Sequence, residues 1–472
     1  MTRISDYFFF VAFWLLLTSS SMRITATEES DRTKIYALHF PQFHNDRLNS
    51  EIWGDGFTDW NNLNKTPALN RLGRTILRPH RDVGYYDQAS YQTRKLQGDL
   101  ARKYGIDGFI YHHYWFHYHG EHATLSTPLE RMLVDGEPSI PFAFNWAAES
   151  WTSTWQGVTK KRTRGLLHDQ FCPMKNDSRI SLHYQFLKKF FHHPKYIKVH
   201  GMPLFHFFRH QQPPKKDTCY HLLERLQELA VADGFPSPGL YVLHSENDVG
   251  RHEIYSKQLP PSAFEAANNN LPPNNMKLKR PISSFEPAGL FYYPYTQRLY
   301  GNVTTIPARC FSRDFAPSIY PKPQYLSSVV HFDNTPRRHF NHSIVWDRSQ
   351  LLVTVELGAG QGGDQAASWR DRSLTPGRSL ELDLLHLLLY ERCCQEPTIR
   401  ERGGQFVVVN AWNEWGEGMA LEPSSTWGYQ FLEAVTKAKA AAAKIVSSSS
   451  SSSSAASCDW AKYRGYLQEI LS

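Results

Sequence analysis

Short apolar runs of strand length alternate with amphipathic segments of helix length along most of this 472-residue chain. The expected strands are residues 34–40, 106–116, 140–147, 202–209, 239–246, 284–290, 326–332 and 406–409. The expected helices are residues 91–104, 181–191, 221–233 and 379–394. Such alternation is typical of α/β proteins with a parallel sheet. Eight units predict a (β/α)8 TIM-type barrel with long loops, and a doubly wound open sheet is the alternative.

Two acidic residues follow the last expected strand. Glu414 and Glu417 are framed by Trp412 and Trp415 and by two glycines. Carboxylates just beyond a buried strand suit general acid/base chemistry at the mouth of a barrel. A solvated pair on a helix surface is disfavoured, because each glycine costs about 1 kcal/mol in a helix interior and no apolar stripe runs through the segment. We therefore predict that both glutamates are catalytic.

The ends of the other strands supply the candidate substrate-binding residues. They are Asp59, Trp60, His112, His113, Tyr114, Glu149, Trp151, Asp333, Asn334, Arg337, Asn413 and Trp415. The alternative for residues 59 and 60 and for residues 333–337 is plain anchoring of loops. The histidines of residues 112–119 lack an acidic partner at metal-ligand spacing, so sugar-contacting or structural roles are favoured over a metal site. No metal or cofactor is expected.

A glycine-rich stretch, residues 351–363, follows a strand-like run and resembles a cofactor loop. The segment behind it is a poor helix, and the stretch falls inside an apparent insertion between the seventh and eighth strands. Both observations disfavour cofactor binding.

The N-terminus carries a basic residue, an apolar run and then small residues. This layout predicts a signal peptide over residues 1–27, with an uncleaved signal anchor as the alternative. Sequons at Asn64, Asn176, Asn302 and Asn341 agree with the secretory pathway, and we expect a glycoprotein in the extracellular space or in the Golgi or ER lumen. Six cysteines would then meet oxidising conditions, as disulfides or as buried thiols.

The barrel is expected to occupy residues 30–435. An Ala/Ser-rich stretch, residues 436–457, predicts a low-complexity linker. The C-terminal tail, residues 458–472, is either a short helix docked through Cys458 or a free end.

Aromatic residues make up 14% of the chain, which suits a cleft that stacks sugar rings but fits an aromatic core equally well. The net charge of +7 comes without a dense Lys/Arg run, so nucleic-acid binding is not expected. It is compatible with an acidic polysaccharide. A glycan or polysaccharide is the expected partner, and a membrane only if the N-terminal segment is an uncleaved anchor.

A set of fragments in fixed order resembles a known family. They are HFPQFH, WGDGFTDW, GYYD, YGIDGFIYHHYWF, HPKYIKVHGMPLF, DNTPRR and AWNEWGEG. Together they resemble the WbsX-type proteins over most of residues 34–435. Those proteins are labelled glycosyltransferases of polysaccharide synthesis and are similar to family 99 glycoside hydrolases, the endo-α-mannosidases.

The resemblance implies a retaining two-carboxylate mechanism on an α-glycosidic bond. Glu414 would be the base on a sugar 2-hydroxyl, giving a 1,2-anhydro sugar, and Glu417 the general acid/base. The third strand departs from the pattern: relatives commonly read WANENWTRRWDG, and this chain reads WAAESWTSTWQG. The lost arginines remove donors that bind anions or hydroxyls, so the relatives' substrate does not carry over.

Three functions remain open on the sequence. They are a glycoside hydrolase-like enzyme, a glycosyltransferase and a catalytically inactive glycan-binding protein. The Asp-x-Asp pattern that many metal-dependent sugar transferases use is absent from the chain, which favours the hydrolase-like mechanism.

Overall fold

The computed structural model describes residues 33–117, 123–153, 165–208, 216–245, 289–292, 324–338, 340–343, 345–346, 348, 352–357, 368–394, 404–447 and 457–471. The predicted signal peptide, the sequon at Asn302 and the Ser-rich run lie outside these residues.

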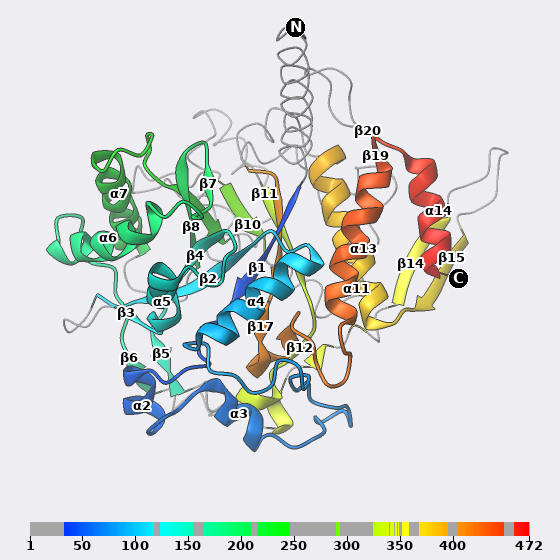
Figure 1. Ribbon diagram of the computed structural model, residues 1–472, viewed down its shortest axis with the longest axis horizontal. Helices are drawn as coiled ribbons and strands as arrows, with labels where there is room; N and C mark the ends of the chain where they lie inside the picture. The colour runs from blue at the N-terminus through cyan, green and yellow to red at the C-terminus, as the bar shows by residue number, and fades with distance from the viewer. Residues whose placement is uncertain are drawn as a thin grey trace, which may run out of the picture.

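A parallel sheet forms the centre of the molecule (Figure 1). Its strands are β1 (Lys34–His39), β2 (Gly108–Trp115), β4 (Phe142–Ala147), β8 (Met202–Phe208), β9 (Tyr241–Ser245), β10 (Gly289–Tyr292), β11 (Gln324–Val329) and β16 (Phe406–Asn410). The predicted strands are thus found, with bounds shifted by a few residues. The sixth was expected at residues 284–290, and residues 284–288 lie outside the described residues.

The pairing of these strands is parallel throughout. It runs in the order β1, β16, β11, β10, β9, β8, β4 and β2, and β1 also pairs with β2. Tyr36, for example, pairs with Val408 on one side and with Gly108 on the other. The prediction of an α/β protein with a parallel sheet is confirmed. Parallel strands covered on both faces read as continuous apolar runs, and β16 is buried along its whole length.

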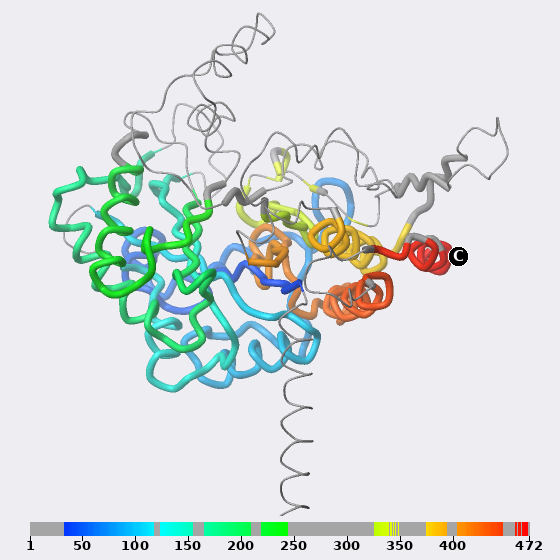
Figure 2. Tube along the Cα trace, turned by 90° about the horizontal axis from the view of Figure 1, so that it is seen from above, coloured from blue at the N-terminus to red at the C-terminus, as the bar shows by residue number. Residues whose placement is uncertain are grey.

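Helices pack around the sheet (Figure 2). They are α4 (Tyr91–Tyr104), α5 (Thr127–Asp135), α6 (Ser178–Phe191), α7 (Lys216–Ala232), α11 (Pro376–Leu389) and α13 (Gln430–Ile445). Gly105 ends α4 in a left-handed conformation, with φ of 88°, as its position after an amphipathic run predicts. At the carboxyl ends of the strands lie two short helices, α2 (Arg47–Trp53) and α3 (Asp59–Lys65). No helix among the described residues is long and apolar enough to cross a membrane.

The predicted linker is not supported over residues 436–445, which belong to α13. Alanine is the strongest helix former, and Ala438, Ala441 and Ala442 are buried in the core. The chain ends in α14 (Trp460–Leu471), and a disulfide joins Cys458 to Cys393. The alternative of a short helix held through Cys458 is therefore confirmed.

The strand-like run before the glycines belongs to an antiparallel strand pair outside the main sheet. β14 (Leu352–Leu357) pairs with β15 (Ser368–Ser373), and residues 358–367 between them lie outside the described residues. A cofactor loop needs a helix directly behind it, and here a strand follows.

Helix α13 is fixed to the start of β2 by a partly buried ion pair. Lys439 Nζ lies 2.6 Å from Asp107 Oδ2, and the same carboxylate oxygen accepts a 2.7 Å hydrogen bond from the Ile35 backbone N–H. One carboxylate therefore joins β1, β2 and α13.

We expect Lys439→Met to lower the free energy of unfolding by about 1–3 kcal/mol, because Asp107 keeps its burial and loses its cation. Urea unfolding measures the change. Lys444→Met, on the exposed side of the same helix, is the control and is expected to change little. Equal stabilities for the two variants would contradict the prediction.

Candidate active site

The two catalytic candidates lie in a small hairpin after β16. Asn413–Glu414 (β17) pairs with Met419–Ala420 (β18), and the 3-10 turn Trp415–Glu417 (η9) lies between them. The Asn413 amide fixes the hairpin to the end of β1: its Oδ1 accepts from the Phe40 N–H at 2.7 Å, and its Nδ2 donates to the Phe40 carbonyl at 2.9 Å. Both glutamates are thereby held at the carboxyl end of the central sheet.

Arg337 lies at the centre of the candidate site, in the 3-10 turn Thr335–Arg337 (η5). Its Nη1 is 2.6 Å from Glu414 Oε1 and 3.5 Å from Glu417 Oε1. Its Nη2 and Nε bond to the two oxygens of Asp59 at 2.8 and 3.2 Å. One guanidinium thus joins three carboxylates from two separate segments, helix α3 and the hairpin after β16. We call these four residues the Arg337 cluster.

Burial differs sharply between the two glutamates. The Glu414 side chain is 7% exposed and the Glu417 side chain 28% exposed. Burial raises the pKa of Glu414 to about 8; Arg337 opposes this shift, and Glu417 and Asp59 add to it. Burial acts to lower the pKa of Arg337, but the three carboxylates raise it well above its usual range.

Gly416 lets the hairpin approach the ion pair. A Cβ at this position would lie 2.3 Å from Asp59 Oδ2 and 2.4 Å from Arg337 Nε, closer than atoms pack. Asp59 itself starts helix α3 and also accepts a 3.1 Å hydrogen bond from Asn62. The glycine of this segment is therefore a steric requirement of the Arg337 cluster.

Strand β2 divides its candidates between two faces, as alternation along a strand requires. The His112 and Tyr114 rings lie 6.4 Å apart. Burial, together with the positive charge of Arg337, lowers the pKa of His112 to about 4. Burial, together with the negative charge of Glu414, raises the pKa of Tyr114 well above its usual value. Both therefore lie near the Arg337 cluster. His113 points to helix α6 and lies 2.9 Å from His183, nitrogen to nitrogen. The structure does not bring His113 to the site.

The two candidate tryptophans beside the cluster are part of its scaffold. Trp415 is 0% exposed and Trp60 7% exposed, and their rings lie 6.2 Å apart. Trp60 donates to the Tyr86 carbonyl at 2.8 Å. Asn413 is equally buried and bonds to β1. These three residues orient the site and present little surface to a ligand.

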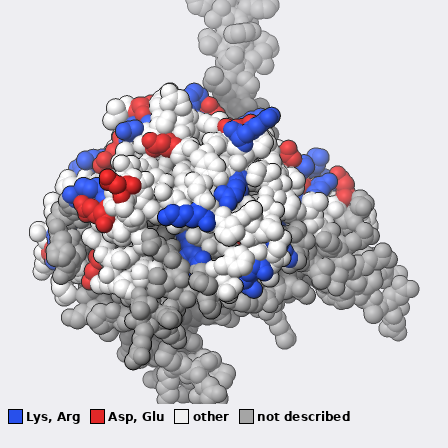
Figure 3. Space-filling model, turned by 90° about the horizontal axis from the view of Figure 1, so that it is seen from below, with Lys and Arg blue, Asp and Glu red and all other residues white. Residues whose placement is uncertain are grey.

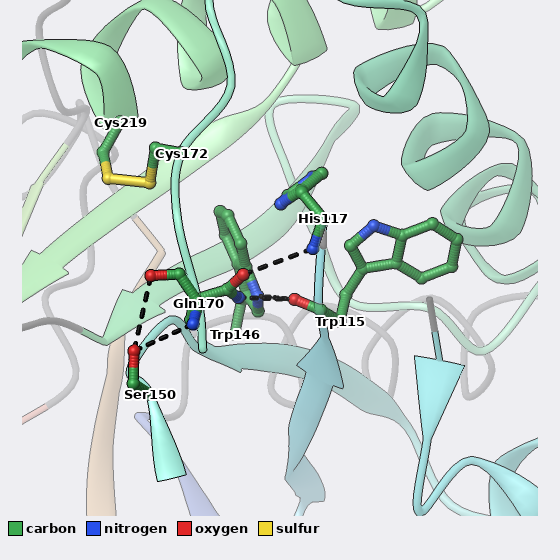
Figure 4. The surroundings of a disulfide bond; sticks show 7 residues. All are labelled: Trp115, His117, Trp146, Ser150, Gln170, Cys172 and Cys219. Carbon is green, nitrogen blue, oxygen red and sulfur yellow. Dashed lines mark hydrogen bonds between the residues drawn. A yellow bond between two sulfur atoms is a disulfide. The ribbon is translucent and has the colours of Figure 1, made fainter. Parts of the chain in front are cut away.

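The loop after β4 carries Glu149 and Trp151. Trp151 packs edge-on to Tyr114 at 5.7 Å, and Glu149 contributes to raising the pKa of Tyr114, so the loop borders the cluster. Its base is fixed by Gln170, which accepts from the Ser150 hydroxyl and donates to the Trp115 carbonyl at 2.5 Å (Figure 4). The disulfide between Cys172 and Cys219 lies beside this contact.

Asp333 and Asn334 shape the turn that carries Arg337. Asp333 accepts from Asn70 at 2.9 Å and from the Thr335 N–H at 3.0 Å, and both Asp333 and Asn334 are buried. Their contacts are those expected of loop anchoring, which was the alternative interpretation of this segment.

Sequence reasoning missed Glu422, a buried carboxyl behind the cluster. It accepts four hydrogen bonds of 2.7–2.9 Å, from Tyr86, Gln97, Trp412 and Trp415. Burial raises its pKa to about 7, against the effect of these donors. The signal was an acidic residue in the apolar run MALEP directly behind the glutamate hairpin. Glu422 fixes the tryptophans on both sides of Glu414.

No group of His, Cys, Asp and Glu side chains within the described ranges is arranged to hold a metal ion. The chemistry on offer is that of carboxylates with different burial, bridged by a guanidinium and bordered by aromatic rings. Such a site is typical of enzymes that act on glycans.

The family model "Glycosyltransferase WbsX" matches residues 35–356 and 386–435. The chain belongs to this family, and the resemblance stated from its sequence is confirmed. It is also similar to the "Uncharacterized protein WxcX" of two Xanthomonas campestris pv. campestris strains, with 26% identity over 429 residues. The alignment covers 89% of this chain, but only 51% of each relative, so the chain spans about half their length.

Solved structures with a similar trace include a "Glycoside hydrolase-like protein" (14% identity, TM-score 0.43, covering 86% of this chain and 94% of that chain). Another is the GH99 endo-alpha-mannosidase from Bacteroides thetaiotaomicron (10% identity, TM-score 0.41, covering 87% and 97%).

We expect Gly416→Ala to lower the enzymatic activity proposed in the next subsection at least about tenfold, because the added Cβ displaces Asp59 or Arg337 from the cluster. Kinetics of that activity and thermal unfolding measure the effect. Gly465→Ala in α14, where nothing lies within 4 Å of the added carbon, is the control. Wild-type turnover in the Gly416 variant would show that the close approach does not matter to the chemistry.

Proposed function

We propose that the protein cleaves or rearranges an α-glycosidic bond of a glycan or polysaccharide by a retaining, two-carboxylate mechanism. One observation carries the proposal. Because Arg337 Nη1 lies 2.6 Å from Glu414 Oε1 and 3.5 Å from Glu417 Oε1, these oxygens are at most about 6 Å apart. Retaining glycosidases hold their carboxyls about 5–5.5 Å apart and inverting ones about 6.5–9.5 Å.

The two glutamates are assigned different roles. Glu414 is the base that removes a proton from the sugar hydroxyl next to the reacting carbon. Its raised pKa makes its ionised form a stronger base, and Arg337 orients the carboxylate. Glu417, the more exposed of the two, is the acid that protonates the leaving oxygen and then activates the acceptor. His112, Tyr114, Glu149 and Trp151 are the proposed sugar-contacting residues.

We also propose that the parallel sheet is a (β/α)8 barrel. The pairing of β1 with both β16 and β2 supports this, because a closed sheet has no edge strand. In such barrels catalytic residues stand at the carboxyl ends of the strands, where Glu414 and Glu417 lie.

Passage through the secretory pathway is part of the proposal. The sequons at Asn64, Asn176 and Asn341 are exposed, and two disulfides, Cys172–Cys219 and Cys393–Cys458, suit an oxidising compartment. A secreted or lumenal glycoprotein therefore remains our proposal.

A glycosyltransferase of polysaccharide synthesis is the second candidate, and the family's name favours it. Transfer and hydrolysis share the same first step in a retaining site, and the acceptor decides between them: water, or a sugar hydroxyl. A catalytically inactive glycan-binding protein is the third candidate.

We expect Glu414→Gln and Glu417→Gln each to lower turnover by about 10² or more, the usual scale for losing general acid/base catalysis. The measurement is sugar release from a panel of algal, plant and microbial polysaccharides and α-mannosyl glycans, without sugar nucleotide. Release by the wild type alone supports the hydrolase. If no sugar is released from the panel but sugar transfer appears once nucleotide sugars are added, the result supports the transferase. If the wild type and both variants bind glycans and none of them turns a glycan over, the result supports the third candidate.

The pH profile separates the two roles. The substrate for this test is an aryl glycoside whose leaving group departs without acid assistance, so that only the base has to be in its reactive form. If Glu414 is the base it must be ionised, so kcat/KM for this substrate should rise about tenfold per pH unit below pH 8 and level off above it. Glu414→Gln should remove this rising limb. A rate that instead falls above pH 8 would assign Glu414 as the acid and reverse the two roles.

A further inference from the structure

A cavity adjoins helix α3 and the η5 turn, the two segments that carry Asp59 and Arg337 of the cluster. It has a volume of about 350 Å³ and is lined by Asn62, Lys65, Thr66, Pro67, Thr335, Pro336, Arg338 and Phe340. We call it the outer pocket. Its size lies within the range of small-molecule sites, which is about 300–1,000 Å³.

The outer pocket shares its walls with the candidate active site. Helix α3 supplies Asp59 to the Arg337 cluster and Lys65 to the pocket, and Asn62, which lines the pocket, donates to Asp59 at 3.1 Å. In the η5 turn, Arg337 points to the carboxylates and its neighbour Arg338 lines the pocket. A ligand in the pocket therefore contacts the same two segments that hold the catalytic cluster.

The charge of the lining has one sign. Among the described residues of the lining, Lys65 and Arg338 are charged and none is acidic. Lys65 is exposed, and the Phe340 ring is 40% exposed. Two cations beside an accessible ring suit a charged sugar, since a guanidinium or ammonium pairs with an anionic group and a flat ring packs against the apolar face of a sugar.

The surroundings strengthen this positive field. Between Asp59 and Asp82 the chain has no acidic residue but five basic ones, namely Lys65, Arg71, Arg74, Arg78 and Arg81. Arg71 donates to the Ser343 carbonyl and Arg78 to the carbonyls of residues 63 and 66, and these neutral acceptors do not cancel the charges of the two arginines. Arg81, by contrast, lies 3.7 Å from the Asp82 carboxylate. In Figure 3, Lys and Arg gather over the middle of the face on the α2 and α3 side, and Asp and Glu lie toward its rim.

We propose that the outer pocket is a subsite for an acidic sugar residue of the glycan, whose carboxylate or sulfate group binds Lys65 and Arg338 while its ring packs on Phe340. The conclusion that the substrate is an acidic glycan rests on the proposed function, whereas the binding of an acidic sugar to the outer pocket can be measured without turnover. The subsite selects a polyanionic glycan, because a neutral glycan can accept hydrogen bonds from the two cations but gains no charge pairing with them.

The test is a binding titration, by calorimetry, with the full chain carrying Glu417→Gln so that no sugar is released. Asn64→Gln and Asn341→Gln are included throughout, because both exposed sequons adjoin pocket residues and an attached glycan would reach the pocket. The probes are a six-residue oligogalacturonate and its methyl ester, and a sulfated galactan oligosaccharide and its desulfated form. The two anionic probes separate a carboxylate ligand from a sulfate ligand.

We expect at least one anionic probe to bind tenfold or more tightly than its neutral counterpart, and to bind more weakly as ionic strength rises. Lys65→Glu and the Lys65→Gln, Arg338→Gln pair should each weaken that binding tenfold or more, and Phe340→Ala should weaken it severalfold. Arg81→Gln is the control for general surface charge: its side chain is 92% exposed and does not line the pocket, and the change should alter binding less than twofold.

Three results would overturn the proposal. They are no binding of either anionic probe, equal binding of the charged and neutral forms, and equal losses in the pocket variants and in Arg81→Gln. Circular dichroism excludes misfolding, and Lys65→Glu changes an exposed residue only. If the anionic probes bind as expected but the wild type releases no sugar from any glycan, the subsite proposal is supported and the hydrolase proposal is contradicted. Failure of the subsite proposal can therefore be told apart from failure of the proposed function.

Discussion

One guanidinium shared by three carboxylates is the constraint on which the site depends. Arg337 is buried, and an unpaired buried cation would cost several kcal/mol, so Asp59 and Glu414 must reach it. Those partners come from the loop after β1 and from the hairpin after β16, segments far apart in the sequence that the pairing of β1 with β16 brings together. Burial, with the negative charges of Glu417 and Asp59 added to it, keeps the pKa of Glu414 high although Arg337 opposes the shift. The ion pair with Arg337 therefore does not cancel the effect of burial on this carboxyl.

A second carboxyl supports this arrangement from behind. Glu422 presents two oxygens to four donors, which a neutral amide could not match, because its own N–H groups would oppose two of them. Two of the donors are indole groups on either side of Glu414. The tryptophans around the glutamates therefore orient the hairpin through their nitrogens, and their faces are covered. The candidates left to contact a sugar are the half-buried ones, His112 and Glu149, with Tyr114 and Trp151 at the border.

The position of the candidate site could be predicted from the sequence, because polar residues that directly follow buried strands lie together at the carboxyl ends of a parallel sheet. The apolar run at residues 406–409 and the glutamates behind it needed only the period of a buried strand. The face of the strand on which each side chain lies was harder to predict. The side chains of His112 and His113 lie on opposite faces because successive residues of a strand alternate between faces, and the local sequence does not indicate which of the two points toward the site. The pairing of Arg337 with Asp59 joins positions 278 residues apart, so it depends on the arrangement of the strands in the sheet and not on any local pattern. The alanines of residues 438–442 suggested a linker by composition, but their helix propensity and burial prevailed.

The side of α3 and η5 that faces the sheet and the side that lines the outer pocket carry charges of opposite sign. Toward the sheet, three carboxylates outnumber one guanidinium, and the charged side chains among the described residues that line the outer pocket are Lys65 and Arg338. If the proposed active site and subsite both hold, an anionic sugar would be repelled from the Arg337 cluster and attracted to the outer pocket. On an acidic glycan this opposition would set the register of the chain, because the charged residue is held outside while a neutral linkage reaches Glu414 and Glu417. Specificity for the substrate would then come from excluded positions as much as from favourable contacts.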